Sequence, residues 1–100
     1  MFASTKYVTN GIRDSLPPSM QNMLWYMIET MQVEDGKDYL QVFQLEGIMV
    51  DGKLKQRIIH TQEQPEYRKE YALSVKQIKS EKIYVIDDKT HCTMLLAEEY

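Results

Sequence analysis

The side chains in this sequence that could carry out chemistry are two histidines, one cysteine and two adjacent aspartates: His60, His91, Cys92, Asp87 and Asp88. A metal ion needs several ligands together, but neighbouring residues of a strand point to opposite faces of a sheet, which separates His91 from Cys92. A reactive thiolate at Cys92 would need a nearby cation or imidazole, and adjacency in the sequence does not supply one. We therefore expect Cys92 to be a small buried hydrophobic residue and His60 to be an ordinary strand residue.

The aspartate pair is followed by Lys89 and Thr90. Two carboxylates in this setting are typical of a solvent-facing β-turn, although in principle they could act as an acid and base pair. The sequence shows no glycine-rich phosphate loop, nucleophile elbow or zinc-type ligand spacing. We expect a protein that is not an enzyme and that uses no cofactor and no metal ion.

The most distinctive stretch runs from 58 to 67, where amide, acidic, imidazole and aromatic side chains surround Pro65. It could form a recognition loop, because binding residues concentrate on loops held by a rigid scaffold. The alternative is a hairpin turn whose polar residues only satisfy backbone groups. The predicted interaction surface joins this stretch to nearby basic residues and consists of His60, Gln62, Glu63, Glu66, Tyr67, Lys55, Arg57 and Arg68.

Charge is distributed unevenly along the chain. The net charge is -3, yet residues 53 to 82 contain eight lysines and arginines against four glutamates, an excess of four positive charges. Together with Tyr67, Tyr71 and Tyr84, these cations could bind single-stranded nucleic acid by neutralising phosphates and stacking on bases. The alternative is that they form the solvated outer faces of strands, which the acidic net charge favours.

One helix is predicted over Pro17 to Met31. Proline suits a first helical turn because its φ is already helical and it lacks the N–H that this turn leaves unpaired. Trp25 and Tyr26 are expected to flank the apolar side of the helix. That side is formed by residues three and four positions apart, namely Met20, Met23, Leu24, Met27, Ile28 and Met31.

Strands are predicted on both sides of this helix. Lys6 to Ile12 suits a first strand with Gly11 as a bulge, and from Asp38 onward apolar residues recur with the period of two that is typical of sheets. Asp51-Gly52 favours a tight hairpin, because both residues accept positive φ. Further turns are expected at Gln64-Pro65 and between the last two strands. The chain of 100 residues is thus expected to form one α+β domain, 1–100, with a meander of five to six antiparallel strands and one helix on one face.

A single helix can cover only one face of such a sheet. The other face must be polar and wet, or it must be covered by sheet curling, by a second copy or by another molecule. We therefore predict a protein-interaction module that uses a sheet face or an edge strand to bind itself or another protein. Nucleic-acid binding through residues 53 to 82 is the alternative.

The chain is expected to be cytoplasmic. One cysteine permits no internal disulfide, as is usual for intracellular proteins. The first residues lack the basic start, apolar core and cleavage site of a secretory leader. No window approaches the roughly 20 apolar residues of a membrane helix, and no membrane partner is expected.

Several blocks of the sequence look familiar together. They are Lys6-Tyr7-Val8-Thr9 with Gly11-Ile12, Leu24-Trp25-Tyr26-Met27-Ile28, Asp38-Tyr39-Leu40-Gln41-Val42-Phe43, Ile59-His60-Thr61-Gln62-Glu63 with Pro65-Glu66-Tyr67, and the closing Thr93-Met94-Leu95-Leu96-Ala97-Glu98-Glu99-Tyr100. Across nearly the whole chain they resemble the short Gram-positive bacterial proteins of the domain of unknown function 960 family. The resemblance implies a stand-alone cytoplasmic protein of uncharacterised role, and it assigns no catalytic residue and no cofactor.

Overall fold

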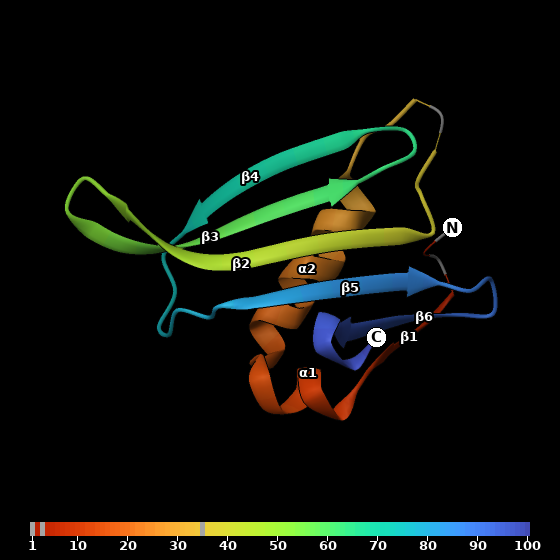
Figure 1. Ribbon diagram of the computed structural model, residues 1–100, viewed down its shortest axis with the longest axis horizontal. Coiled ribbons are helices and arrows are strands. Elements are labelled where there is room, and N and C mark those ends of the chain that lie inside the picture. Colours follow the sequence, from red (N-terminus) through yellow and green to blue (C-terminus); the bar gives the residue numbers. More distant parts are fainter. Residues whose placement is uncertain (1, 3, 35) are drawn as a thin grey trace.

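The computed structural model describes residue 2 and residues 4–34 and 36–100. A six-stranded sheet lies in front of one long helix, and a shorter helix sits below it (Figure 1). The elements in chain order are β1 (Thr5–Val8), α1 (Asn10–Ser15), α2 (Pro18–Thr30), β2 (Leu40–Val50), β3 (Lys53–Gln62), β4 (Tyr67–Leu73), β5 (Glu81–Asp87), β6 (His91–Leu96) and the 3-10 helix η1 (Ala97–Glu99). The predicted α+β class is therefore confirmed.

The predicted helix is α2, and its apolar side faces the sheet. Met20, Leu24 and Ile28 are buried on that side. Of the two flanking aromatic residues, Trp25 is only 8% exposed whereas Tyr26 is 64% exposed. The indole is buried because α2 rests on the sheet along that edge, where the Lys6 ammonium lies 5.8 Å from its centroid.

The first strand is shorter than predicted, because the chain turns into α1 after Val8. The Thr9 hydroxyl caps this helix by accepting from the Ile12 N–H at 3.3 Å, and it donates to the Glu99 carboxylate at 2.7 Å. Gly11 is accordingly helical rather than a bulge. A Cβ added at Gly11 would lie 2.6 Å from the Glu99 carboxyl carbon, so glycine leaves room for this carboxylate.

The three predicted hairpins are present. β2 pairs with β3, β3 with β4 and β5 with β6, all antiparallel. Asp51 (φ 51) and Gly52 (φ 78) both adopt the positive φ expected of the first turn. The hairpins are not laid down in chain order, however, because the strand order is β1-β6-β5-β2-β3-β4. The predicted meander is thus interrupted after β4, and β1 joins the far edge parallel to β6.

The connection from β4 to β5, residues 74–80, must therefore cross β3 and β2. A buried glutamine, Gln56 of β3, holds it against the sheet. The Gln56 amide nitrogen donates to the carbonyl of Lys79 at 3.0 Å, and its oxygen accepts from the Lys79 N–H at 2.7 Å. The same nitrogen lies 3.0 Å from the Glu46 carbonyl. These bonds satisfy backbone groups that the crossing would otherwise leave unpaired.

The core fills the space between α2 and the sheet. Side chains of β2, β3, β5 and β6 alternate between the two faces, and most of those facing α2 are buried. The apolar members of this layer include Phe43, Leu45, Ile58, Ile83, Val85 and Met94. Burial of this layer supplies the hydrophobic part of the folding free energy.

Candidate interaction surface

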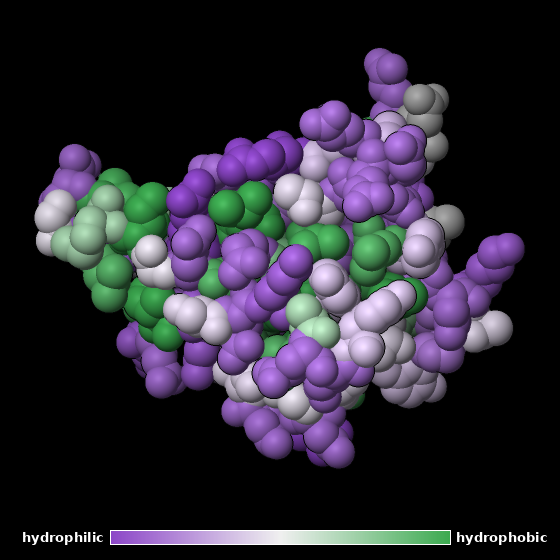
Figure 2. All heavy atoms as spheres, viewed as in Figure 1, coloured by the Kyte–Doolittle hydropathy of each residue, from purple (hydrophilic) through white to green (hydrophobic). Residues whose placement is uncertain are grey.

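The face of the sheet opposite α2 is the candidate interaction surface, and we call it the open face. Its residues follow from the strand register, because paired residues lie on the same side. In Figure 2 apolar patches lie in the middle of this face, with hydrophilic side chains around them. Outside the projecting end of the β2–β3 hairpin, the residues of the open face are Leu40, Val42, Gln44, Glu46, Arg57, Ile59, Thr61, Arg68, Glu70, Ala72, Lys82, Tyr84, Ile86, His91, Thr93 and Leu95.

The centre of the open face is formed by β2 and its two neighbours. Val42 pairs with Tyr84 on one side and Thr61 on the other, and it remains partly accessible. Over the β5 and β6 side lie η1 and the chain end, where the Tyr100 ring meets the Tyr84 ring edge-on at 5.4 Å between centroids. The open face is therefore partly covered at one side and accessible over β2, β3 and β4.

Two arginines and two glutamates form an ion-pair cluster on this face. Arg57 lies 2.8 Å from Glu70 and 3.5 Å from Glu46, and Arg68 also binds Glu70. The hydrogen bond that Arg57 donates to Glu70 raises the pKa of Arg57, and the bonds that Glu70 accepts from Arg57 and Arg68 lower the pKa of Glu70. Two of the predicted basic residues, Arg57 and Arg68, are thus paired with neighbouring carboxylates.

His60 and Gln62 belong to the core and not to the surface, which corrects the predicted site. His60 is completely buried and Gln62 is 3% exposed, because both point from β3 toward α2. The His60 ring stacks on Phe43 at 4.3 Å between centroids. Neither side chain can contact a partner that docks on the surface.

Hydrogen bonds fix the protonation of His60. The Gln41 amide nitrogen donates to the Asp38 carbonyl at 3.0 Å and to the Gln62 side-chain oxygen at 2.7 Å. The Gln41 oxygen therefore faces His60 Nε2, 2.6 Å away, and Nε2 must carry the proton. Nδ1 is buried without a partner among the described atoms. Burial lowers the pKa of His60 from 6.5 to about 4, so the imidazole is neutral at physiological pH.

The loop between β3 and β4 is fastened by the same network. Gln62 donates to the Pro65 carbonyl at 2.8 Å, and Asp38 accepts from the Gln64 N–H at 3.1 Å. Glu63 and Glu66 are exposed at its tip. The polar residues near this turn thus satisfy backbone groups, which was the structural alternative to a recognition loop.

The remaining predicted site residues do not lie together on one surface. Tyr67 lies on the α2 side, edge-on to His60 at 5.2 Å between centroids, whereas Arg57 and Arg68 lie on the open face. Lys55 is on the projecting end of β3, and its ammonium lies 3.3 Å from the Ser74 hydroxyl. The eight residues are thus divided between two faces, a loop and a hairpin.

Comparison with known proteins identifies the family. Residues 5–99 match the family described as staphylococcal protein of unknown function, DUF960. The chain belongs to this family. The match also confirms the resemblance seen in the sequence. A solved structure has a similar fold and is described as the crystal structure of the protein of unknown function from Enterococcus faecalis. It has a TM-score of 0.73 and 22% sequence identity, and the match covers 97% of this chain and 91% of the other. No curated protein matches the chain.

In this DUF960 protein the cysteine, histidine and aspartate side chains considered for chemistry are engaged in contacts within the fold. Cys92 is buried on the α2 side, and His91 points to the opposite face, where its Nε2 lies 3.1 Å from Asp88. Asp87 was expected in a solvent-facing turn but is 7% exposed, because its carboxylate accepts the backbone N–H groups of Phe2 at 2.8 Å and Lys89 at 2.9 Å.

Within residues 2, 4–34 and 36–100, no cluster of three or more His, Cys, Asp or Glu side chains is arranged to hold a metal ion. In the same residues, no helix has the length and apolar character needed to cross a membrane.

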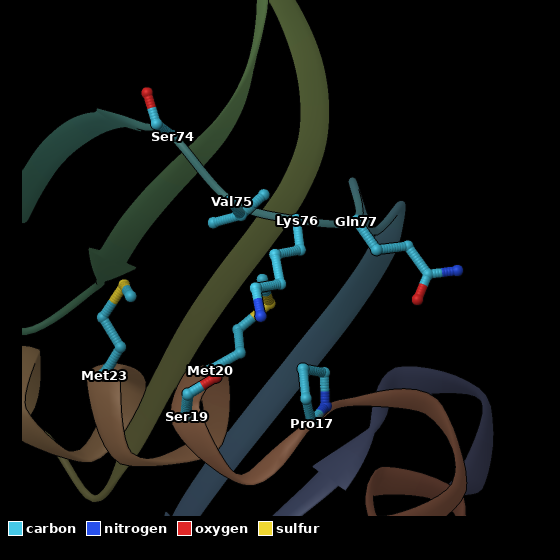
Figure 3. Close-up of a pocket in the computed structure, with 8 residues that line it drawn as sticks. All are labelled: Pro17, Ser19, Met20, Met23, Ser74, Val75, Lys76 and Gln77. Atoms are coloured by element: carbon cyan, nitrogen blue, oxygen red, sulfur yellow. The ribbon is translucent and has the colours of Figure 1, made fainter.

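Two surface features of the DUF960 chain were missed by sequence reasoning. One is the projecting end of the β2–β3 hairpin, seen at the left of Figure 1. The other is a groove of about 450 Å3 between the start of α2 and the β4–β5 connection (Figure 3). The uninterrupted apolar run Ile48-Met49-Val50, directly before the Asp51-Gly52 turn, was the available signal for the first.

Proposed function

We propose that this DUF960 protein is a non-enzymatic protein-interaction module whose contact surface is the open face. The observation that supports this proposal is the composition of that face. Val42, Ile59 and Ile86 are among its central residues, and charged side chains surround them. An apolar centre with a polar rim is the usual arrangement of protein interfaces. The DUF960 family and the solved structure of similar fold are described only as proteins of unknown function, so the proposed activity comes from this geometry.

The rim also limits the chemistry of the partner. Arg57, Arg68, Glu70 and Lys82 place both signs of charge beside the apolar centre. A partner with an apolar stripe flanked by both acidic and basic groups would pair with this rim, and like-charged surfaces would be rejected. A protein surface offers this mixture, whereas nucleic acid offers one sign only.

The absence of enzymatic activity is part of the proposal. A catalytic thiol or imidazole has to reach a substrate, and here Cys92 and His60 are both fully buried. The Asp87 carboxylate is occupied by backbone N–H groups. These contacts favour structural roles for all three residues.

Site-specific photo-crosslinking in cells tests the proposal. A photoreactive phenylalanine analogue at Ile59, on the open face, is expected to form a discrete adduct with another protein. The same analogue at Tyr26, which is 64% exposed on α2, is the matched control and should not form that adduct. Val42→Glu should abolish the Ile59 adduct, because a carboxylate at the apolar centre would be buried on docking. Identical adducts from both positions, or none from Ile59, would contradict the proposal.

Nucleic-acid binding through residues 53 to 82 is the second candidate. In its favour, the Lys82 ammonium lies 5.7 Å from the Tyr84 ring on the open face, which pairs a cation with a stacking surface. Against it, Arg57 and Arg68 are engaged by Glu70. Binding of labelled single-stranded oligonucleotides should weaken steeply with salt if phosphates are contacted. A Lys82→Ala variant that binds as well as the wild type, or no binding at low salt, would exclude it.

A further inference from the structure

The β2–β3 hairpin extends beyond the body of the molecule as an arm, which we define as residues 47–56. Its register runs from Gly47 opposite Gln56 to Val50 opposite Lys53. Met49 and Leu54 face each other on the α2 side, where they are 61% and 59% exposed. Figure 1 shows the arm directed away from α2, so the helix does not cover these side chains. Two large apolar side chains are thus presented together on a rigid hairpin.

A groove lies on the same side of the molecule. Its volume is about 450 Å3, and its apolar lining includes Pro17, Met20, Met23 and Val75. Figure 3 shows Met20 and Met23 rising from α2 toward the β4–β5 connection, with Lys76 beside them. Methionine side chains are flexible and polarizable, so they adapt readily to an inserted apolar group. The groove therefore suits aliphatic side chains.

The arm and the groove form one continuous strip. A Cβ at Gly47, on the α2 side of the arm, would lie 3.3 Å from Leu54 and 3.3 Å from Ile78. Ile78 directly follows Gln77, which lines the groove. Leu54, Gly47 and Ile78 thus connect the exposed end of the arm to the groove along one side of the molecule.

We propose that two copies of this chain pair through the strip, with Met49 and Leu54 of each copy in the groove of the other. A two-fold axis makes both contacts at once, because an isologous interface needs the projecting group and its receptor on the same surface of one chain. The charges also agree. Asp51 at the arm tip carries a negative charge, and Lys76 at the groove carries a positive one. Reciprocal insertion brings these opposite charges together twice.

The strip and the proposed contact surface lie on different sides of the sheet. The open face lies on the other side of the sheet and stays accessible in the dimer. The dimer is therefore independent of the proposed function, and either can fail alone.

Sedimentation velocity across a concentration series tests the proposal on the full chain. The wild type should change from monomer to dimer as concentration rises, and Leu54→Glu should weaken the dimer at least about tenfold, as expected for a central apolar contact. Tyr26→Glu, at an exposed aromatic residue outside the strip, is the matched control and should dimerise like the wild type. Circular dichroism verifies that each variant folds. A wild type that stays monomeric, or a Leu54→Glu variant that dimerises normally, would overturn the proposal.

A charge-reversal pair distinguishes reciprocal insertion from any other dimer. Asp51→Lys and Lys76→Asp should each weaken the dimer, because each places like charges together, and the double variant should recover wild-type association. Mixing the two single variants provides a second arrangement, in which both contacts regain opposite charges, so the heterodimer should form more strongly than either homodimer. Failure of the double variant to recover would exclude the proposed contact even if the protein dimerises through another surface.

Discussion

Acidification should destabilise this protein in a pH range set by His60. The imidazole is fully buried against Phe43, and its Nε2–H is donated to Gln41. Protonation would place a second N–H at Nδ1, which has no acceptor among the described atoms. Burial therefore lowers the pKa of His60 from 6.5 to about 4.

The sign of the effect follows from which state binds the proton. Between pH 6.5 and about pH 4 the unfolded chain has a protonated His60 and the native protein does not, so stability falls as pH falls through this window. Above the window both states are neutral, and below it both are protonated. The difference between a pKa of 6.5 in the unfolded chain and about 4 in the native protein corresponds to about 3 kcal/mol of stability. About 2 kcal/mol of this is lost by about pH 5. This is a large share of a typical folding free energy of roughly 5–15 kcal/mol.

Urea denaturation of the wild type and of His60→Phe, at about pH 7.5 and about pH 5, measures this contribution. Phenylalanine keeps the stacked ring but cannot be protonated, so the variant is expected to lack the loss of about 2 kcal/mol that the wild type shows. The comparison at each pH removes the contribution of carboxylates such as Glu70, whose pKa is also lowered. His91→Phe, which replaces the histidine on the open face, is the matched control and should retain the wild-type loss. Equal losses in the wild type and in His60→Phe would refute the assignment of a buried, neutral imidazole.

Three further predictions concern other contacts. Gln56→Leu removes the hydrogen bonds that hold the β4–β5 connection, so it should lower the free energy of unfolding by about 2–4 kcal/mol in urea denaturation. The control Gln44→Leu, at an exposed site, should change it by less than about 0.5 kcal/mol. Equal effects of the two substitutions would contradict the role of Gln56. Gly11→Ala should destabilise the wild type by displacing Glu99, but in a Glu99→Ala background it should stabilise α1 by up to about 1 kcal/mol, and the same sign in both backgrounds would argue against this contact. Cys92 should react with a thiol reagent only when urea unfolds the protein, and rapid labelling of the native state would show that it is accessible.

Much of the fold was predictable because its signals are local. The start of α2 follows from prolines at the first helical turn, and its buried side follows from the spacing of apolar residues. The first hairpin follows from Asp51-Gly52, because the need for positive φ is confined to these two residues. The separation of His91 from Cys92 follows from the alternation of a strand. Each inference depends only on residues a few positions apart.

The candidate site was less predictable because burial is decided by which strand lies beside which. The polar run containing His60 and Gln62 reads as a surface, yet Gln41, 19 residues from His60, supplies the partner that lets the imidazole be buried. The arm and the groove were missed for the same reason. Whether Met49 is covered depends on where α2 lies, and the sequence does not state this.

The sequence by itself determined the long helix α2, most of the strands and their tight turns, and the family to which the chain belongs, but not the short helix α1. The tertiary structure alone decided the order of the strands and which polar residues are buried. Thr9 begins a helix because Glu99, 90 residues away, supplies a carboxylate, and the chain crosses from β4 to β5 where Gln56 satisfies its backbone. Such contacts between distant residues leave no periodicity in the sequence. The open face, which the single helix leaves uncovered, was foreseen as a surface, but its residues could be named only once the strand register was known.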